Sequence, residues 1–290
     1  MKKILLLGGH GLLGKEISRL LDERRYVLIA PTSAQLDITD YQALESILKG
    51  EMPTDVINLA ARRNIDELEK DPLPGWQVNT FGAAAIGRIL SKHKIRSSYF
   101  FMSTSYVFGS SLTAKAEDDA HAPVNVYGET KSVAEELIVH YCGGTGIPFW
   151  IGRASWMYGR ARESFVDEVA KMLLRGEKYE AAIDQSGNTT SAAEVAGAVV
   201  SLCIEKQIAC GAYHFLNEDP GRTSRFDIAR EIASALAISP ERVVPAESRD
   251  IFSGGGRPSI SLVNTKIPPL RNWREALREY IVTRYTANHL

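Results

Sequence analysis

Residues 4–14 read ILLLGGHGLLG, a short apolar run that passes directly into a glycine cluster. A run of this kind is typical of a strand buried on both faces of a parallel sheet. Apolar residues then recur at helical spacing through residues 11–24, at Leu13, Ile17 and Leu20. The sequence therefore predicts a strand, a glycine-rich turn and a helix in direct succession.

The glycine cluster has the spacing G-x-x-G-x-x-G. Its glycines allow a tight turn, let a pyrophosphate approach bare backbone, and let the helix pack closely on the strand. The helix N-terminus adds free N–H groups and a partial positive charge that favour a phosphate. We expect a dinucleotide to bind along this segment, at Gly8, His10, Gly11, Leu12, Leu13 and Gly14.

The choice of dinucleotide depends on the end of the second predicted strand, which reads Ala30-Pro31-Thr32-Ser33. An acidic residue at this point would accept the ribose hydroxyls of NAD, and these four residues include none. Thr32 and Ser33 could hydrogen-bond to a 2′-phosphate, which favours NADP(H), with NAD(H) as the open alternative. The same two residues would serve equally well to form a turn.

Short buried strands alternate with helices through the first half of the chain. Strands are predicted at residues 4–7, 27–30, 55–60, 99–103 and 149–153, and helices at 11–24, 41–49, 79–93 and 127–141. Asp40 is the expected N-cap of the helix at 41–49. This alternation predicts an α/β fold with a doubly wound parallel sheet, the Rossmann arrangement.

The alternation of strands and helices becomes less regular after residue 153. Predicted elements here are helices at 164–175, 192–204, 223–236 and 273–285, a strand at 212–217 and a loop at 253–258. We expect a smaller, mostly C-terminal α/β lobe that binds substrate beside the sheet. The predicted division is residues 1–152 with 190–218 for the dinucleotide and 153–189 with 219–290 for the substrate.

Composition narrows the class of protein. The chain has 290 residues, of which 44% are hydrophobic and 24% charged, with a net charge of −1. These values suit a globular protein with a sizeable core and give no electrostatic reason to expect a nucleic-acid or membrane partner. The three cysteines have no metal-ligand spacing, and no apolar run is long enough for a signal peptide or a membrane span. We expect a cytoplasmic protein, without a metal, that could form a homodimer.

A catalytic pair is indicated by Tyr127 and Lys131, which stand in a Y-x-x-x-K pattern at the start of a predicted helix. Residues four apart share a helix face, so the ammonium can approach the phenol and lower its pKa from about 10. Such a phenol can give a proton to a carbonyl that receives a hydride. Thr104 follows a predicted strand and could polarise the same carbonyl, because the carboxyl ends of parallel strands face the ligand crevice.

Three segments make the resemblance to a family specific: residues 101–108, FMSTSYVF; residues 123–131, PVNVYGETK; and residues 153–159, RASWMYG. They resemble the dTDP-4-dehydrorhamnose reductases, which belong to the extended short-chain dehydrogenase/reductases. Further matches cover nearly the whole chain, at residues 36–40, 58–61, 78–79, 184–187 and 257–262. The resemblance implies reduction of the 4-keto group of a nucleotide-linked deoxysugar with NADPH or NADH.

The same resemblance implies roles for individual residues. The catalytic set would be Thr104, Tyr127 and Lys131. Further cofactor contacts would come from Asp37, Ile38, Leu59, Ala60, Ala61, Arg62, Asn79 and Met102, together with Tyr127 and Lys131. Substrate contacts would come from Thr104, Ser105, Tyr106, Ser155, Trp156 and Arg257, the last of these directed at phosphates.

Three positions depart from the family pattern. Ser105 stands where aspartate is usual, which bears on the sugar more than on the reaction type. Thr189-Thr190 replaces a proline and threonine. Arg62-Arg63 replaces a less charged pair and resembles the regulatory β subunit of methionine adenosyltransferase. Two alternatives therefore stay open: a sugar-nucleotide epimerase or dehydratase with bound NAD, and an NADP-binding regulatory subunit.

Overall fold

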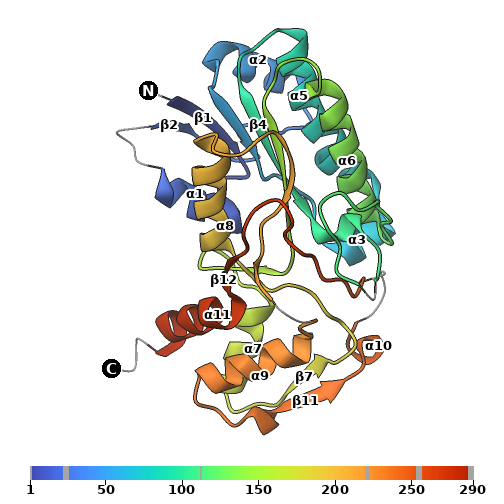
Figure 1. The fold of residues 1–290 in the computed structure, drawn as a ribbon, viewed down its shortest axis with the longest axis vertical. Coiled ribbons are helices and arrows are strands. Elements are labelled where there is room, and N and C mark those ends of the chain that lie inside the picture. Colours follow the sequence, from blue (N-terminus) through green and yellow to red (C-terminus); the bar gives the residue numbers. More distant parts are fainter. Residues whose placement is uncertain (1, 22–25, 112, 220–221, 253–256, 287–290) are drawn as a thin grey trace.

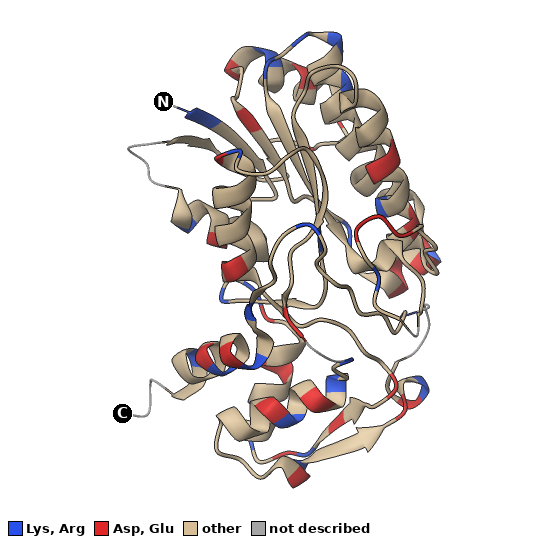
Figure 2. Ribbon diagram, in the orientation of Figure 1, with Lys and Arg blue, Asp and Glu red and all other residues tan. Residues whose placement is uncertain are grey.

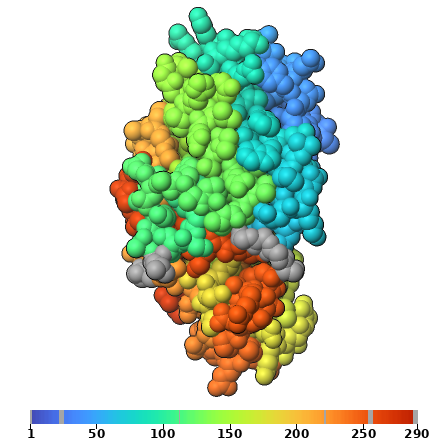
Figure 3. Space-filling view, turned by 90° about the vertical axis from the view of Figure 1, so that its right-hand side faces the viewer, coloured from blue at the N-terminus to red at the C-terminus, as the bar shows by residue number. Residues whose placement is uncertain are grey.

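The computed structural model describes residues 2–21, 26–111, 113–219, 222–252 and 257–286. A larger body built on a parallel sheet lies above a smaller lobe (Figure 1). Figure 3 shows the green segments of the sheet body lying directly above the orange and yellow segments of the lobe. Residues 253–256 of the loop predicted at 253–258 lie outside the described residues.

The central sheet has six parallel strands in the order β2-β1-β3-β4-β5-β9. Its strands are β1 (Lys2–Leu7), β2 (Tyr26–Ile29), β3 (Asp55–Asn58), β4 (Ser98–Thr104), β5 (Phe149–Ala154) and β9 (Gly211–His214). The predicted doubly wound sheet is therefore confirmed. Strand order reverses at β1, which pairs with β2 on one side and β3 on the other. Ligands bind at such a switch point, outside the carboxyl ends of the strands.

Helices cover both faces of the sheet. The helices α1 (Leu12–Leu20) and α8 (Ala192–Ala198) pack together on one face, while α2 (Tyr41–Glu51), α5 (Ala83–Lys92) and α6 (Val126–Cys142) cover the other (Figure 1). Strand β1 shows how the sequence encodes this arrangement. Ile4 and Leu6 belong to the core under the first face, and Leu5 and Leu7 to the core under the second. A continuous apolar strand is what two covered faces require.

The smaller lobe has a core of its own, in which Val169, Ile232 and Trp273 are fully buried. Its main elements are α7 (Phe165–Leu174), α9 (Arg225–Ala235) and α11 (Trp273–Ile281), with β7 (Tyr179–Ala182) parallel to β11 (Val243–Ala246). The sequence analysis missed this strand pair. Each strand has only four residues, and the buried positions do not alternate along them, so the period-2 signal is absent.

Short elements complete the chain. They are α3 (Ile65–Lys70), α4 (Leu73–Gly75), α10 (Ser248–Ile251), β6 (Met157–Tyr158), β8 (Thr190–Ser191), β10 (Asn217–Glu218) and β12 (Leu270–Asn272). Single 3₁₀ turns occupy Ser105–Val107 and Pro240–Arg242, and π-helical stretches occupy Trp76–Gly82, Val199–Ile204 and Val282–Thr286.

Helix boundaries differ most from expectation before α5. The helix predicted at residues 79–93 begins earlier, at Leu73, and includes the π-helical stretch Trp76–Gly82. Asn79 and Thr80 in that stretch hydrogen-bond to α6, and polar side chains in the middle of a helix gave no boundary signal. The predicted cap was right: the Asp40 side chain accepts hydrogen bonds from two backbone amides of α2, each at 3.0 Å.

Acidic and basic residues are interspersed over the helices of both bodies (Figure 2). Among the described residues, no helix is both long and apolar enough to cross a membrane. No group of His, Cys, Asp or Glu in the described part of the chain is arranged to hold a metal ion.

Candidate active site

The glycine turn connects β1 to α1 at the switch point of the sheet. Gly8 has a φ of +77°, and a Cβ there would lie 2.8 Å from the Ala60 amide nitrogen. A Cβ at Gly14 would lie 2.4 Å from the Gly8 carbonyl oxygen. These contacts permit only glycine. Gly11 caps α1, and no side chain accepts a hydrogen bond from the first turn of the helix, which leaves its amides directed at the crevice.

The other residues expected to contact the cofactor differ in their exposure to solvent. His10 is exposed, Leu12 is half-buried and Leu13 is buried in the core. Leu59, Ala60, Ala61 and Arg62 follow β3, at the carboxyl end of the strand beside β1, and become progressively more exposed. Met102 is buried within β4. The predicted residues therefore converge on one edge of the sheet.

The hydroxyls of Thr32 and Ser33, which are expected to hydrogen-bond to a 2′-phosphate, have different surroundings. Thr32 is engaged in a turn, where its hydroxyl lies 3.1 Å from the Gln35 side-chain oxygen. Ser33 is exposed at the same turn. Asp37 accepts hydrogen bonds from Thr39 at 2.9 and 2.8 Å. Thr32 thus takes part in a turn, and Ser33 has the more accessible hydroxyl of the two; a contact of either with a 2′-phosphate stays a prediction.

Both polar atoms of the Asn79 side chain are engaged in hydrogen bonds within the protein. Its side-chain oxygen accepts from the Arg62 backbone amide at 2.8 Å. Its side-chain nitrogen donates to the Arg62 carbonyl at 2.8 Å and to the Thr130 hydroxyl at 3.0 Å. Asn79 therefore fastens the loop after β3 to α6. It can therefore assist a cofactor through the position of Arg62, and a contact of its own stays a prediction.

Tyr127 sits in the first turn of α6, beside the segment that follows β4. Asn125 caps this helix by accepting from the Gly128 amide at 2.7 Å. A Cβ at Gly128 would lie 2.1 Å from the Tyr106 carbonyl oxygen, so glycine is what lets the two segments touch. The Tyr106 and Tyr127 rings then meet edge to face, with centroids 6.2 Å apart.

The expected catalytic hydroxyls are in contact. Thr104 hydrogen-bonds to the Tyr127 phenol and thereby lowers its pKa, and the charge of Arg63 acts in the same direction. Burial is the larger influence and raises the pKa of Tyr127 above its ordinary value of 10.0. Thr104 is itself held by a hydrogen bond from the Tyr106 amide at 3.3 Å. The structure thus brings together the proton donor and the hydroxyl expected to orient a carbonyl.

Lys131 is one turn further along α6 and is almost completely buried, with 1% of its surface exposed. Its Nζ has no hydrogen-bond partner and lies 4.0 Å from the centroid of the Phe101 ring. Burial lowers the pKa of Lys131 to about 7, and the charge of Glu135 opposes this shift. The cation that acts on the pKa of Tyr127 is Arg63, while the Lys131 ammonium stands over Phe101. The expected effect of Lys131 on the Tyr127 phenol stays a prediction.

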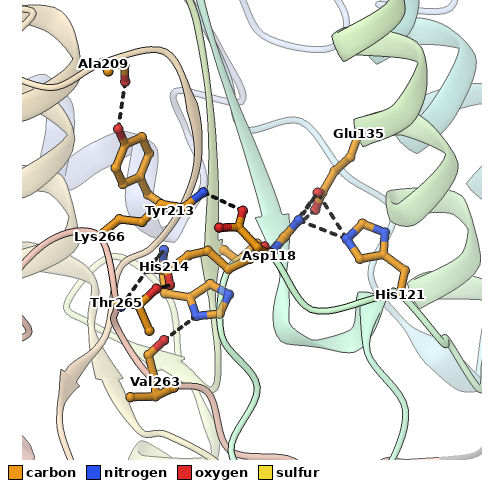
Figure 4. Close-up of polar contacts among 11 residues, drawn as sticks. Asp118, His121, Glu135, Ala209, Tyr213, His214, Val263, Thr265 and Lys266 are labelled. Atoms are coloured by element: carbon orange, nitrogen blue, oxygen red, sulfur yellow. Dashed lines mark hydrogen bonds and ion pairs between the residues drawn. The ribbon is translucent and has the colours of Figure 1, made fainter.

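A buried polar network adjoins the site, and Figure 4 shows Glu135 and His121 within it. Glu135, one turn after Lys131, receives three hydrogen bonds of 2.6–3.2 Å from the Arg153 guanidinium on β5. Glu135 also accepts from Ser103, the residue before Thr104. His121 lies 2.9 Å from Arg153. This network ties the strand that bears Thr104 to the helix that bears Lys131.

Beyond Arg153 the same network reaches Glu117, whose carboxylate receives hydrogen bonds from the backbone and side chain of Thr265. Burial raises the pKa of Glu117, but these hydrogen bonds and the charge of His214 outweigh it, so the pKa is lowered. Burial lowers the pKa of His214 to about 4. Both groups serve to anchor the segment at Thr265 against the sheet (Figure 4).

The expected substrate residues line the side of the site that faces the smaller lobe. Ser105 and Ser155 are buried, and neither hydroxyl has a hydrogen-bond partner. Trp156 has a φ of +30°, and its ring packs so closely on Gly187 that a Cβ there would lie 2.9 Å away. Arg257 forms an ion pair with Asp66 at 2.8 Å. Its guanidinium is therefore already bound to a carboxylate.

A family profile described as the RmlD substrate binding domain matches residues 1–286. The chain belongs to this family. A dTDP-4-dehydrorhamnose reductase of Streptomyces griseus is 31% identical, over 95% of this chain and 91% of its own length. A dTDP-4-keto-6-deoxy-D-glucose reductase of Streptomyces niveus is 29% identical, over 95% of both chains.

The fold of this RmlD-family chain is also that of a solved structure. A dTDP-4-dehydrorhamnose reductase from Bacillus anthracis, crystallised in complex with NADP, superposes with a TM-score of 0.88. The two chains are 24% identical, and the match covers 98% of this chain and 100% of that one. This likeness confirms the predicted fold.

Sequence reasoning missed two features of this family member. Arg63 was noticed only as part of an unusual pair, yet its charge reaches the Tyr127 phenol. Arg225 was not singled out, yet its guanidinium lies 4.6 Å from the centroid of the Trp156 ring. Neither belongs to a motif with an evident spacing. Their proximity to the site depends on the placement of α3 and α9, which local sequence does not reveal.

Proposed function

We propose that the protein is an oxidoreductase that reduces the 4-keto group of a nucleotide-linked deoxysugar, with NADPH as hydride source and Tyr127 as proton donor. One observation carries this proposal: Thr104, which ends β4, hydrogen-bonds to the Tyr127 phenol, and the buried Lys131 follows Tyr127 by one turn of α6. The family membership and the names of the relatives from Streptomyces support the same reaction and a dTDP-linked keto-sugar as substrate.

The residues present fit a nicotinamide dinucleotide. Gly8 and Gly14 have no room for a Cβ, and no side chain caps the first amides of α1, which leaves them available to a phosphate. The Lys131 ammonium is buried without an acceptor, and ribose hydroxyls are acceptors of the kind that it lacks. Leu59, Ala60 and Arg62 would flank the ribose and pyrophosphate. When bound, the dinucleotide supplies the hydride.

The chain itself supplies the proton and the geometry. The Tyr127 phenol gives its proton to the carbonyl oxygen as that oxygen becomes a hydroxyl, and Thr104 donates a second hydrogen bond there. The phenolate that remains is stabilised by the charge of Arg63. Because Tyr127 is partly buried, these groups act in a medium of lower dielectric than water and need little rearrangement. Ser105, with its unpartnered hydroxyl, would orient the sugar.

NADP(H) is the proposed cofactor, with NAD(H) as the alternative. No carboxylate stands at residues 30–33, where one would repel a 2′-phosphate. Ser33 offers an exposed hydroxyl at that turn. The Bacillus anthracis reductase, which shares this fold, was crystallised in complex with NADP. The predicted domain boundaries, the cytoplasmic location and the homodimer stay predictions.

The test is the consumption of NADPH in the presence of a dTDP-linked 4-keto-6-deoxyhexose. Tyr127→Phe should retain NADPH affinity and lose at least about a hundredfold in turnover, because proton transfer by a positioned side chain contributes 10²–10⁴-fold. Tyr141→Phe, at the far end of the same helix, is the matched control and should be unchanged. Full turnover by Tyr127→Phe would refute the assigned role. Tight NADPH binding by the wild type without turnover of any keto-sugar would refute the reductase and favour a regulatory subunit.

A further inference from the structure

Lys131 is a buried amine to which the described part of the protein offers no acceptor. The residue keeps 1% of its surface exposed, and no described residue accepts a hydrogen bond from its Nζ. Nζ instead lies 4.0 Å from the centroid of the Phe101 ring. The face of an aromatic ring attracts a cation, but it offsets only part of the cost of removing that cation from water. These surroundings favour the neutral amine over the ammonium.

Glu135 is the carboxylate best placed to stabilise an ammonium here, since residues four apart share a helix face. Its charge opposes the effect of burial on the pKa of Lys131. However, Glu135 receives three hydrogen bonds from the Arg153 guanidinium on β5 and one from Ser103 on β4. His121, from the segment before α6, lies 3.5 Å from the same carboxylate. Glu135 is therefore bound to other partners, and Arg153 offsets its charge.

The other elements around Lys131 bring neutral or cationic groups. Tyr127, one turn earlier on α6, has a raised pKa and stays a neutral phenol between pH 7 and 9. Arg63, from the loop after β3, carries a positive charge that acts on this phenol. The π-helical stretch before α5 contributes Asn79, a neutral amide that hydrogen-bonds to α6. Burial therefore prevails and lowers the pKa of Lys131 from 10.5 to about 7.

A lysine can exchange its contact with a ring for a hydrogen bond. Its four-carbon stem is flexible, so Nζ can leave Phe101 for the crevice beside Tyr127, where the dinucleotide is expected to bind. The ribose hydroxyls are acceptors, and the pyrophosphate adds negative charge at the same edge of the sheet. Hydrogen bonds and opposite charge both favour the ammonium. Binding therefore raises the pKa of Lys131 toward its ordinary value of 10.5.

We infer that the dinucleotide and a proton bind together: Lys131 is a neutral amine in the protein alone at pH 8 and becomes an ammonium against the ribose, with the proton taken from solvent. The inference rests on the proposed function and adds a pH dependence to cofactor affinity. The change is –NH₂ + H⁺ → –NH₃⁺, so no other reactant is needed. Above pH 7 the complex holds more protons than its separate components, so affinity must fall as the pH rises.

The experiment is calorimetric titration of the protein with NADPH in two buffers that differ in ionisation enthalpy. The dependence of the measured heat on that enthalpy gives the number of protons taken up per NADPH bound. With the pKa of Lys131 at about 7 in the protein and about 10 in the complex, we expect uptake of about 0.9 proton at pH 8 and about 0.1 at pH 6. NADPH affinity should weaken at least about tenfold from pH 7 to pH 9.

Variants assign the proton to one group. Lys131→Met should take up no proton at pH 8, and its NADPH affinity should be weaker but constant from pH 7 to pH 9. Tyr127→Phe, in the same helix, should retain the uptake, because the phenol stays protonated in this range. His10→Asn tests the imidazole at the glycine turn and should retain it too, as should Lys92→Met, which removes an exposed amine. NADH, which lacks the 2′-phosphate, should give the same uptake as NADPH.

The outcomes separate this inference from the proposed reaction. Wild-type binding at pH 8 without proton uptake would overturn the inference, and this measurement decides even if Lys131→Met does not fold. Uptake that persists in Lys131→Met would also overturn it, because the proton would belong to another group. Proton uptake without reduction of any keto-sugar would leave the coupling intact and refute the reductase. Reduction of a keto-sugar by a protein that takes up no proton would leave the reductase intact and refute the coupling.

Discussion

Lys131→Met should stabilise the protein while it abolishes turnover. The buried ammonium has no hydrogen-bond acceptor, and its pKa falls from 10.5 to about 7. Since each pKa unit is worth about 1.4 kcal/mol, burial of the charge costs up to about 5 kcal/mol in water at low pH and slightly less at pH 7. Methionine has a similar volume and needs no acceptor. After allowance for the lost contact with Phe101, we expect a gain of about 2–4 kcal/mol, or roughly 4–8 °C in Tm.

The pH dependence of this gain identifies its cause. Between about pH 7 and 10.5 the unfolded chain holds the Lys131 proton while the folded protein has released it. Wild-type stability therefore rises with pH in this window, as linkage requires. The advantage of Lys131→Met should be largest at or below pH 7 and should shrink steadily toward pH 10.

Thermal unfolding of both proteins from pH 6 to 10 measures this difference. Lys92→Met is the control, because Lys92 is exposed on α5 and its pKa is raised by Glu45; that variant should show no gain at any pH. NADPH should raise the Tm of the wild type more than that of Lys131→Met, since binding gives the ammonium its missing acceptors. A Tm for Lys131→Met at or below the wild-type value at pH 7, or a gain that does not change with pH, would refute the reasoning.

Two further predictions concern the frame of the site. Gly14→Ala should eliminate measurable NADPH binding and lower the Tm, because its Cβ would lie 2.4 Å from the Gly8 carbonyl oxygen; titration of NADPH fluorescence tests this, and normal affinity would contradict it. Arg153→Met should destabilise the protein by about 3–5 kcal/mol, since it leaves the Glu135 carboxylate buried and unpaired; in urea unfolding, the double variant with Glu135→Leu should recover most of that loss, and a double variant no more stable than the single one would contradict the explanation.

The sheet body could be predicted because the patterns that specify its elements lie within short stretches of sequence. The alternation of apolar strands with helices appears directly in the sequence, and a glycine cluster after the first strand marks the switch point. Each predicted strand of the sheet is present in the structure. The strand pair of the smaller lobe was missed because four-residue strands carry too little pattern to separate them from loops.

The sequence predicted which side chains lie near one another better than it predicted the causes of their pKa shifts. The spacing of Tyr127 and Lys131 predicted that both would face one crevice. Spacing along a helix does not report which residues lie opposite that helix. Phe101, on a strand, is the neighbour of the ammonium. The cation that reaches the phenol is Arg63, from a loop whose position depends on Asn79.

The hydrogen bonds that Glu135 receives explain why the Lys131 ammonium has no partner. Glu135 is the carboxylate whose charge acts on Lys131, yet its oxygens are bound by three hydrogen bonds from Arg153 and one from Ser103. A Glu135 that paired directly with Lys131 would stabilise the protein but would also occupy the donors that a ribose needs. Arg153 prevents this pairing by holding the carboxylate against β4 and β5. The buried network thus maintains an unsatisfied cation at the place where a dinucleotide can satisfy it, at a cost in stability that Lys131→Met would reveal.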